Sequence, residues 1–263
     1  MKRNAVKMVL IFATIVFLPN NIFTQSGTAA GTVKPLSAQA RDFIQKDSKI
    51  EADIWKPCVA LTFDDGPHKY LTPRLLDILK NNDVKATFFV VGNRMKVYPD
   101  IVKRIYNEGH EVGDHTWGHA WLTQIGIGKA TWQIKSAKDT IFQTTGVKPK
   151  LFRPPYGATN KYIADIVAKM GMRQIIWNVD PCDWRDYTPE RTANYILKNT
   201  HDGDIILMHD IHANTIKAVP GIISMFRKKG YVFVAVSSIL EIRNQRWLAK
   251  KAKQDNQILQ AKR

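Results

Sequence analysis

Two adjacent carboxylates and a pair of histidines are the residues whose types and spacing most directly indicate chemistry. The apolar run VALTF is followed by Asp64 and Asp65, which repel each other when ionised unless a cation or a proton offsets the charge. The segment HTWGH holds His115 and His119, and this spacing lets one turn aim both imidazoles at a single point. Two imidazoles and one carboxylate form a three-ligand metal site with positions left open. We therefore predict that one aspartate binds a metal with both histidines and the other takes a proton from water, with a plain Asp-Gly-Pro turn as the alternative.

Further polar and aromatic side chains follow later apolar runs. Arg153, in RPPYG, would keep a catalytic carboxylate ionised and oriented, unless it is a surface residue of a proline-rich loop. His209, after DIILM, is a residue type whose ordinary pKa suits a general acid. Tyr156 and Trp184 would grip sugar rings if they line a cleft, or else pack in the core. The other ionisable groups at these strand ends are Asp180, Asp183 and Asp210.

The remaining histidines lack partners at a useful spacing. We interpret them as surface or structural residues: His68, His110, His201 and His212.

These segments belong to a regular alternation of strand-like and helix-like stretches. Apolar runs predict strands at residues 58–63, 85–91, 110–115, 150–154, 173–179, 204–209 and 231–236. The pattern between them predicts helices at residues 73–82, 98–108, 129–145, 161–170, 189–199 and 215–229. Thr72 and Thr188, each before a proline, are the predicted N-caps, and the predicted C-caps are Gly109, Gly171 and Gly230.

This alternation indicates an α/β fold with a parallel sheet and helices outside it. An open doubly wound sheet and a closed barrel are equally compatible with the pattern. The first strand is not followed by a glycine-rich phosphate loop, so a dinucleotide-binding fold has no support. Because active sites of such folds lie at the carboxyl ends of the strands, we expect the groups named above to form one site.

Five motifs together resemble a known family. TFDDGP, HTWGH, RPPYG, DPCDW and ILMHD occur in the order and at the spacing of the NodB-type polysaccharide deacetylases, carbohydrate esterase family 4. The resemblance covers about residues 56–240. It implies a distorted (β/α) barrel, which we expect to be seven-stranded. It also implies metal-dependent removal of acetyl groups from N-acetylated sugar polymers.

The resemblance also implies roles for the residues of the first three motifs. Asp64 resembles the catalytic base, and Arg153 the residue that braces it. The metal ligands would be Asp65, His115 and His119. The implied cofactor is one divalent ion, which we expect to be Zn²⁺, with Co²⁺ or another divalent ion as alternatives.

The last motifs supply the acid and the substrate contacts. His209 resembles the general acid and Asp183 its partner. Tyr156 matches the position whose backbone N–H helps to hold the oxyanion. The walls of the acetyl pocket would be Trp184 and Leu207.

The two ends of the chain differ in composition from the middle. A basic start and a short apolar run, residues 8–18, are typical of a signal peptide, which we expect over residues 1–30; an uncleaved anchor is the alternative. We expect an arm at 31–54, the deacetylase domain at 55–242 and a basic tail at 243–263. The protein is therefore expected to be exported and to be extracellular, wall-associated or periplasmic.

The formal charge of +16 favours an anionic partner. We expect an N-acetylated polysaccharide substrate, most directly peptidoglycan N-acetylglucosamine. We interpret the basic tail as a solvated or frayed terminal helix, with contact to an anionic envelope surface as the alternative. Chitin or chitooligosaccharides, N-acetylmuramic acid units, xylan and secreted glucosamine polymers are the alternatives. No basic–aromatic reading motif supports a nucleic-acid partner, and a monomer is expected.

Two other functions and a disulfide are less consistent with the sequence. A non-catalytic carbohydrate-binding protein would lack the metal triad or the base, and both are present. A glycosidase would need two carboxylates flanking a bond, whereas Asp64 and Asp65 should point to opposite sides of an extended strand. Cys58 begins the strand that Asp64 ends, about 20 Å away, while Cys182 belongs to the site. We therefore expect two free thiols.

Overall fold

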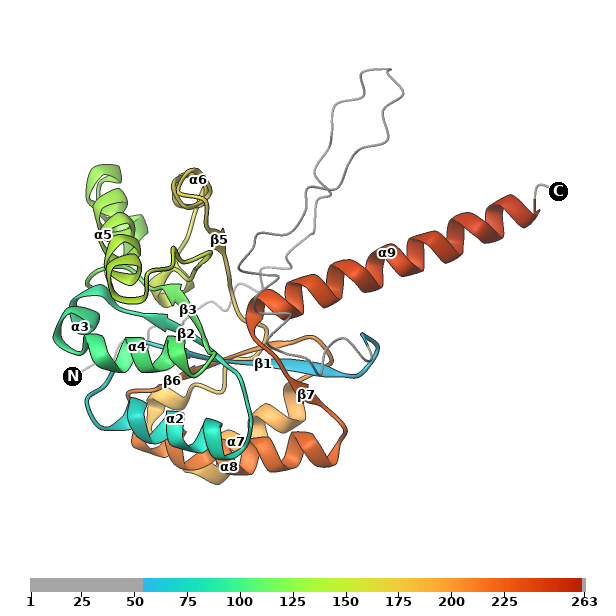
Figure 1. The fold of residues 1–263 in the computed structure, drawn as a ribbon, viewed down its shortest axis with the longest axis horizontal. Helices are drawn as coiled ribbons and strands as arrows, with labels where there is room; N and C mark the ends of the chain where they lie inside the picture. The colour runs from blue at the N-terminus through green and yellow to red at the C-terminus, as the bar shows by residue number, and fades with distance from the viewer. Residues whose placement is uncertain (1–53, 262–263) are drawn as a thin grey trace, which may run out of the picture. The chain divides into compact units, whose positions relative to one another are not determined.

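Seven parallel strands alternate with helices in the computed structural model, which describes residues 54–261 apart from some side chains of the last helix (Figure 1). The strands are β1 (Cys58–Asp64), β2 (Thr87–Val90), β3 (Glu111–Asp114), β4 (Leu151–Phe152), β5 (Arg173–Gln174), β6 (Ile205–His209) and β7 (Val232–Phe233). The helices are α2 (Leu71–Asn81), α3 (Gly92–Val97), α4 (Pro99–Asn107), α5 (Ile127–Thr145), α6 (Lys161–Lys169), α7 (Pro189–Asn199), α8 (Ala213–Lys228) and α9 (Val236–Ala261). Short 3₁₀ helices are η1 (Leu122–Gln124), η2 (Pro155–Gly157) and η3 (Asp183–Arg185).

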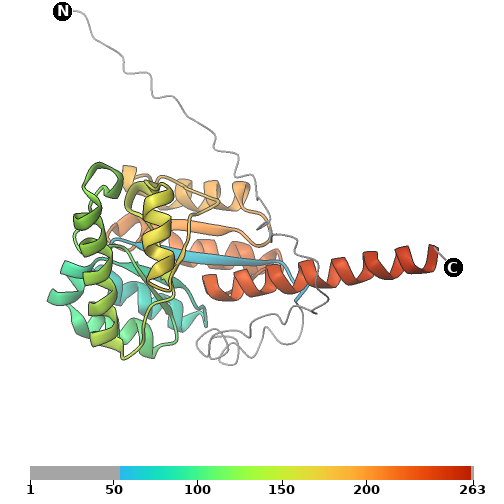
Figure 2. The same cartoon turned by 90° about the horizontal axis from the view of Figure 1, so that it is seen from above.

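The strands pair in the order β5-β4-β3-β2-β1-β6, with β7 paired to the start of β1. The segment that follows β5 returns to β6, where Val179 pairs with Ile206 and the Leu207 N–H donates to the Val179 carbonyl at 2.9 Å. This isolated bridge links the segment after β5 to β6, the strand at the opposite edge of the sheet. The expected distorted (β/α) barrel with seven strands is confirmed in that form, and Figure 2 shows the helices around the strands.

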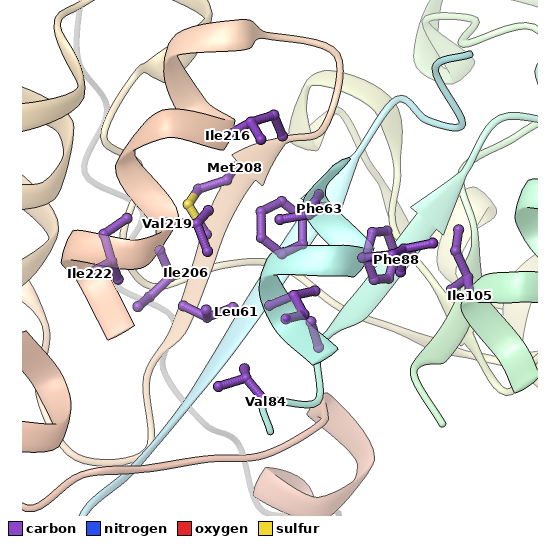
Figure 3. Packing of buried hydrophobic residues seen from close by; sticks show 14 of the residues in the cluster. Leu61, Phe63, Val84, Phe88, Ile105, Ile206, Met208, Ile216, Val219 and Ile222 are labelled. Carbon is purple, nitrogen blue, oxygen red and sulfur yellow. The ribbon is translucent and has the colours of Figure 1, made fainter. Parts of the chain in front are cut away.

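Alternation along the strands separates the core from the site. Leu61 and Phe63 of β1 pack toward the helices, and Met208 of β6 does the same. Figure 3 shows these side chains against α8 residues Ile216 and Val219. Because successive strand residues face opposite sides, the intervening residues of β1 and β6 point into the barrel. Asp64 and His209 therefore end their strands on the inner side.

Several predicted elements are longer, shorter or capped differently in the structure. The predicted strands 173–179 and 231–236 are ordered as strands for only two residues each, and α9 already begins at Val236. The six-residue helix α3 was not predicted, because it is shorter than the window over which helical periodicity is visible. The boundary expected between residues 242 and 243 falls inside α9.

Predicted helix caps are partly confirmed. Thr188 is the N-cap of α7, and its side chain accepts a hydrogen bond from the Arg191 N–H. Thr72 is not a cap, because α2 begins one residue earlier, after Tyr70. The glycines predicted at the ends of α4, α6 and α8 each adopt the left-handed conformation just beyond the cap residue: Gly109, Gly171 and Gly230.

The amino ends of the strands are closed by the start of α9. Glu111, buried at the start of β3, accepts hydrogen bonds from Thr87 Oγ1 at 3.0 Å and from the N–H and hydroxyl of Ser237. Both cysteines are free, as predicted; Cys58 is buried here and Cys182 is partly exposed near the opposite end. None of the described helices has the length and hydrophobicity that a membrane span requires. The segment expected as signal peptide lies outside the described residues, and so does the expected arm apart from Ile54.

Candidate active site

The carboxyl ends of β1 and β6 place a carboxylate beside a histidine. Asp64 and His209 are register partners on these neighbouring strands. Asp64 is 2% exposed, and β2 and β3 continue the same edge through the Val90–Asp114 pair. The carboxyl ends of β1, β6, β2 and β3 thus meet at one edge, as expected for a parallel α/β site.

Asp65 lies opposite the two histidines of the predicted triad. Its Oδ1 atom lies 3.4 Å from Nε2 of His115 and 3.0 Å from Nε2 of His119. One ligand atom from each of these residues falls within 4.8 Å of the others. The chain turns sharply here, because Asp65, Thr116 and His119 all adopt positive φ. The helical turn considered for the histidine pair is therefore replaced by a loop, which still brings both rings together at a centroid distance of 5.0 Å.

The protonation pattern of this triad fits a cation. Nδ1 of His115 lies 2.7 Å from the Arg153 carbonyl, which can only accept, so Nδ1 carries a proton and Nε2 is the ring nitrogen that faces Asp65 and is available to bind a metal. Among the described residues, Asp65 Oδ1 is a buried atom that has no hydrogen-bond partner apart from its approach to these two histidine nitrogens. Burial acts to raise the pKa of Asp65, but the two histidines outweigh it and hold that pKa well below its usual range. Two imidazole nitrogens that converge on an ionised carboxylate in this way are the donor set of a divalent metal site.

Arg153 is fully buried and holds Asp64 in place. Its Nη1 atom donates to Asp64 Oδ1 and to Thr62 Oγ1, both at 2.7 Å. The guanidinium lies 4.1 Å from the ring centroid of Phe89 and 5.7 Å from that of Trp177, in stacking range. The surface position considered for Arg153 is therefore wrong. Because Arg153 takes up Oδ1, the other oxygen of Asp64 faces His115, whose Nε2 lies 3.7 Å away.

Asp183 holds His209 in place and stabilises its protonated form. Asp183 is 1% exposed; its Oδ1 lies 2.7 Å from His209 Nδ1, and its Oδ2 accepts from the His209 N–H at 2.8 Å and from Thr215 Oγ1 at 2.7 Å. Burial acts to lower the pKa of His209. The bond to Asp183 and its charge, with smaller contributions from Asp64 and Asp65, raise this pKa to about 9. His209 therefore carries a proton at neutral pH and can donate it.

The loop that carries the two aspartates rests on Asp210. A β-carbon at Gly66 would overlap the Asp210 carboxylate, so only glycine lets the loop pass this closely. Asp210 accepts from Thr72 Oγ1, and Thr72 Oγ1 accepts from the His68 N–H at 2.8 Å. Burial, with the charge of Asp65, raises the pKa of Asp210 to about 7 against the opposing bond from Thr72.

Aromatic side chains surround the metal-ligand loop. The Tyr156 hydroxyl lies 3.1 Å from His119 Nδ1, and its ring stacks on Trp121 at 4.7 Å. Trp121 is 43% exposed and was not singled out from the sequence, although its position two residues after His119 was the available signal. Trp184 is 49% exposed on η3, which packs on β6, and Leu207 is buried in β6.

Two of the histidines interpreted as surface or structural residues lie near the site. The His212 ring lies 5.9 Å from that of His209, edge to face. His68 follows the aspartate loop directly, and its Nδ1 accepts from the Tyr70 N–H at 3.2 Å. His110, by contrast, is buried and structural, accepting from the Ala86 N–H at 3.2 Å, and His201 lies on the surface.

The orientation expected for the two aspartates, which was one reason against a glycosidase, is wrong. Asp64 and Asp65 do not point to opposite sides, because the positive φ of Asp65 breaks the strand alternation and both carboxylates face His115. A glycosidase needs one carboxyl group that stays protonated to act as its acid, whereas Asp64 is ion-paired with Arg153 and the two histidines hold the pKa of Asp65 well below its usual range. The site still argues against glycosidic cleavage, for this different reason.

Asp180 has a local role, since it accepts from the Cys182 N–H at 2.7 Å.

Comparison with protein families agrees with this geometry. The family model described as polysaccharide deacetylase matches residues 52–175. The peptidoglycan-N-acetylmuramic acid deacetylase PdaC of Bacillus subtilis is 39% identical over 72% of this chain and 40% of its own length. A peptidoglycan-N-acetylglucosamine deacetylase of Bacillus cereus is 36% identical over 71% of this chain and 89% of its own length. The chain spans about two fifths of the length of PdaC and of similar relatives from Listeria monocytogenes.

Solved structures show the same fold. The structure of PdaC superposes with a TM-score of 0.72 at 37% identity, covering 77% of this chain and 99% of that one. A Bacillus anthracis protein described as a CE4 family pseudoenzyme superposes with a TM-score of 0.68 at 29% identity, covering 72% and 66%. Since this fold occurs in a pseudoenzyme, the argument for activity depends on the individual residues of the site.

Proposed function

Because this chain belongs to the polysaccharide deacetylase family, we propose that it hydrolyses the acetamido groups of peptidoglycan N-acetylglucosamine and releases acetate. The single observation that carries the proposal is the arrangement at the edge of β1 and β6. There an Arg153-bound carboxylate and an Asp183-bound histidine flank the Asp65–His115–His119 triad. A carbohydrate-binding protein would need neither the braced base nor the protonated acid.

The residues have complementary tasks in this reaction. A divalent cation held by Asp65, His115 and His119, which we expect to be Zn²⁺, supplies Lewis-acid activation of water and of the acetamide carbonyl. Asp64 accepts a proton from the attacking water, and Arg153 fixes the orientation of its carboxylate.

Bond cleavage then depends on the other side of the site. As the C–N bond breaks, His209 donates its Nε2 proton to the leaving amine, and Asp183 stabilises the imidazolium beforehand through Nδ1. The products are acetate and the free amino sugar. In the proposed site the Tyr156 N–H assists the oxyanion, and Trp184 and Leu207 enclose the acetyl methyl group.

The choice of sugar and the location of the protein are supported by the relatives and the charge. The relatives named above are described as acting on peptidoglycan N-acetylglucosamine or N-acetylmuramic acid. Deacetylation of N-acetylmuramic acid or of chitooligosaccharides is the alternative within the class. The basic tail, the apolar N-terminal run and the charge of +16 support an exported monomer that works at an anionic envelope.

Acetate release tests the proposal directly. Purified full-length protein is incubated with peptidoglycan, with glycan chains lacking peptides and with chitooligosaccharides, each with and without chelator. We expect acetate and free glucosamine from peptidoglycan, loss of both with chelator, recovery with Zn²⁺, and no shortening of the glycan chains. Chain shortening, or no acetate from any glycan in the presence of Zn²⁺, would contradict the proposed activity. Free muramic acid in place of glucosamine would reassign the sugar.

A further inference from the structure

A pocket of about 300 Å³ opens beside the aspartate loop, and none of its lining residues has a role in the proposed reaction. It is lined by Pro67, His68, Lys69, Tyr70, Arg94 and Tyr98. Pro67 is two residues from the metal ligand Asp65, so their Cα atoms lie within about 8 Å. The pocket is therefore next to the site where the acetamide reacts.

Backbone hydrogen bonds fix the pocket to both catalytic loops. The Val91 N–H donates to the Gly66 carbonyl at 2.9 Å, and the N–H groups of Gly92 and Asn93 donate to the carbonyls of Thr116 and Trp117 at 2.9 and 2.8 Å. The start of α3 thus bridges the aspartate loop and the loop between the two metal-binding histidines. Arg94 follows directly on this bridge, which holds its position relative to the metal site.

The pocket carries the positive charges of Lys69 and Arg94. Lys69 and Arg94 form no ion pair with any carboxylate of residues 54–261, and no lining residue is acidic. Lys69 Nζ lies 5.0 Å from the ring centroid of Tyr70, which is 64% exposed. Burial, with the charge of Arg94, lowers the pKa of His68, so this lining histidine stays neutral and adds a polar wall. By contrast, Arg104 of α4, which lies outside the pocket, forms ion pairs with Asp77 and Glu108.

We propose that this pocket is a subsite for a carboxylate carried by the glycan next to the sugar that is deacetylated. The planar fork of Arg94 matches a carboxylate, Lys69 adds a second positive charge, and Tyr70 and Tyr98 offer apolar faces to the group that bears the acid. The inference rests on the proposed function and narrows its substrate to acidic N-acetylated glycans over neutral chitooligosaccharides. The carboxylate has two possible sources in such a glycan: a lactyl ether on the neighbouring sugar, or the peptide attached to it.

Matched ligands test the subsite by binding, without turnover. Full-length, zinc-loaded protein carrying Asp64→Asn is titrated calorimetrically with an N-acetylated disaccharide that bears a free lactyl carboxylate, with its carboxamide, and with the peptide-bearing form. We expect at least about tenfold tighter binding of a carboxylate form than of the carboxamide, and a decline of this preference with added salt. A higher affinity for the lactyl acid or for the peptide form identifies the source.

Two substitutions in the pocket and one control substitution outside it locate the effect. Arg94→Gln and Lys69→Gln are each expected to bring the preference for carboxylate over carboxamide close to one. Lys96→Gln removes the same charge from an exposed position of α3 outside the pocket and should leave the preference intact. Circular dichroism verifies that each variant is folded.

Equal affinity for the acid and the amide in the parent protein would overturn the subsite. So would a preference that persists in both pocket variants, or one that Lys96→Gln removes equally. A phosphate-bearing disaccharide that binds more tightly than the carboxylate would also overturn it. Failure of the proposed function has a different signature, since it is seen as absence of acetate from wild-type protein whatever these affinities are.

Discussion

At the amino ends of its strands the barrel buries Glu111, and at the carboxyl ends it buries Asp64 and Asp183. Both carboxylate oxygens of Glu111 accept hydrogen bonds, from Thr87 and from Ser237, and these bonds join the sheet to α9. The carboxyl ends are different, because most of the buried side-chain polar atoms without a hydrogen-bond partner in the described chain belong to residues there: Asp65, Asp114, Thr116, Arg153 and Asp210.

This difference separates stability from function. A buried polar group without a partner costs about 1–3 kcal/mol, so a cluster of them indicates a place where water, an ion or a ligand completes the bonding. At the amino ends the carboxylate is a structural connector, and its loss should reduce stability. At the carboxyl ends loss of a carboxylate should reduce activity more than stability.

The largest expected effect is at the aspartate pair. Asp64→Asn should lower kcat roughly 10²–10⁴-fold, because the base is lost, while the protein keeps its metal. Asp65→Asn, the neighbouring isosteric change, should lose both metal and activity, because it weakens the triad. Acetate release and metal content after dialysis measure the two effects. Metal loss in Asp64→Asn with retention in Asp65→Asn would mean that the two roles are exchanged.

The next largest effect is expected at the amino ends of the strands, where loss of the Glu111 carboxylate should reduce stability. Glu111→Ala should lower the free energy of unfolding by about 3 kcal/mol, because the buried donors of Thr87 and Ser237 lose their acceptor. Urea unfolding measures the change, and kcat per folded molecule should stay near wild type. Glu190→Ala, on the exposed first turn of α7, is the control and should cost about 1 kcal/mol or less. A large loss of kcat in folded Glu111→Ala would remove the contrast between the two ends.

A smaller effect is expected for the partner of the acid. His209 must be protonated to act, and its pKa of about 9 means that the rate should decline as the pH rises through about 9. Asp183→Asn removes the main groups that raise this pKa and leaves the burial that lowers it. The declining limb should therefore move toward neutral pH, and kcat should fall about 10–100-fold.

The pH profile of kcat on one glycan measures this shift. Thr215→Val is the matched control, because it removes one hydrogen bond to Asp183 and leaves the His209 pair intact. The assignment of Asp183 would be contradicted if the declining limb of the pH profile kept its position in Asp183→Asn but shifted in Thr215→Val.

Much of the site could be predicted because it depends on short motifs at strand ends. The ends of β1 and β6 are recognisable from apolar runs, and a parallel sheet brings them to one edge, so Asp64 and His209 were placed together correctly. What could not be predicted depends on single dihedral angles and on distant packing. The positive φ of Asp65 turns its carboxylate to the same side as Asp64, which strand alternation does not foresee. The charged pocket joins Lys69 to Arg94, 25 positions apart, through the unpredicted helix α3.

The two Thr-Pro pairs show this limit most clearly and carry the smallest prediction. Both pairs resemble helix starts, but only Thr188 caps a helix, while Thr72 is fully buried and joins His68 to Asp210 beneath the aspartate loop. Thr188→Ala should therefore cost about 1 kcal/mol of stability, measured by urea unfolding, with kcat unchanged. Thr72→Val keeps the volume but removes the hydroxyl, so it should lower kcat by disturbing the loop that carries Asp65. If the two variants lost activity equally, the hydroxyl of Thr72 would have no special role in holding that loop.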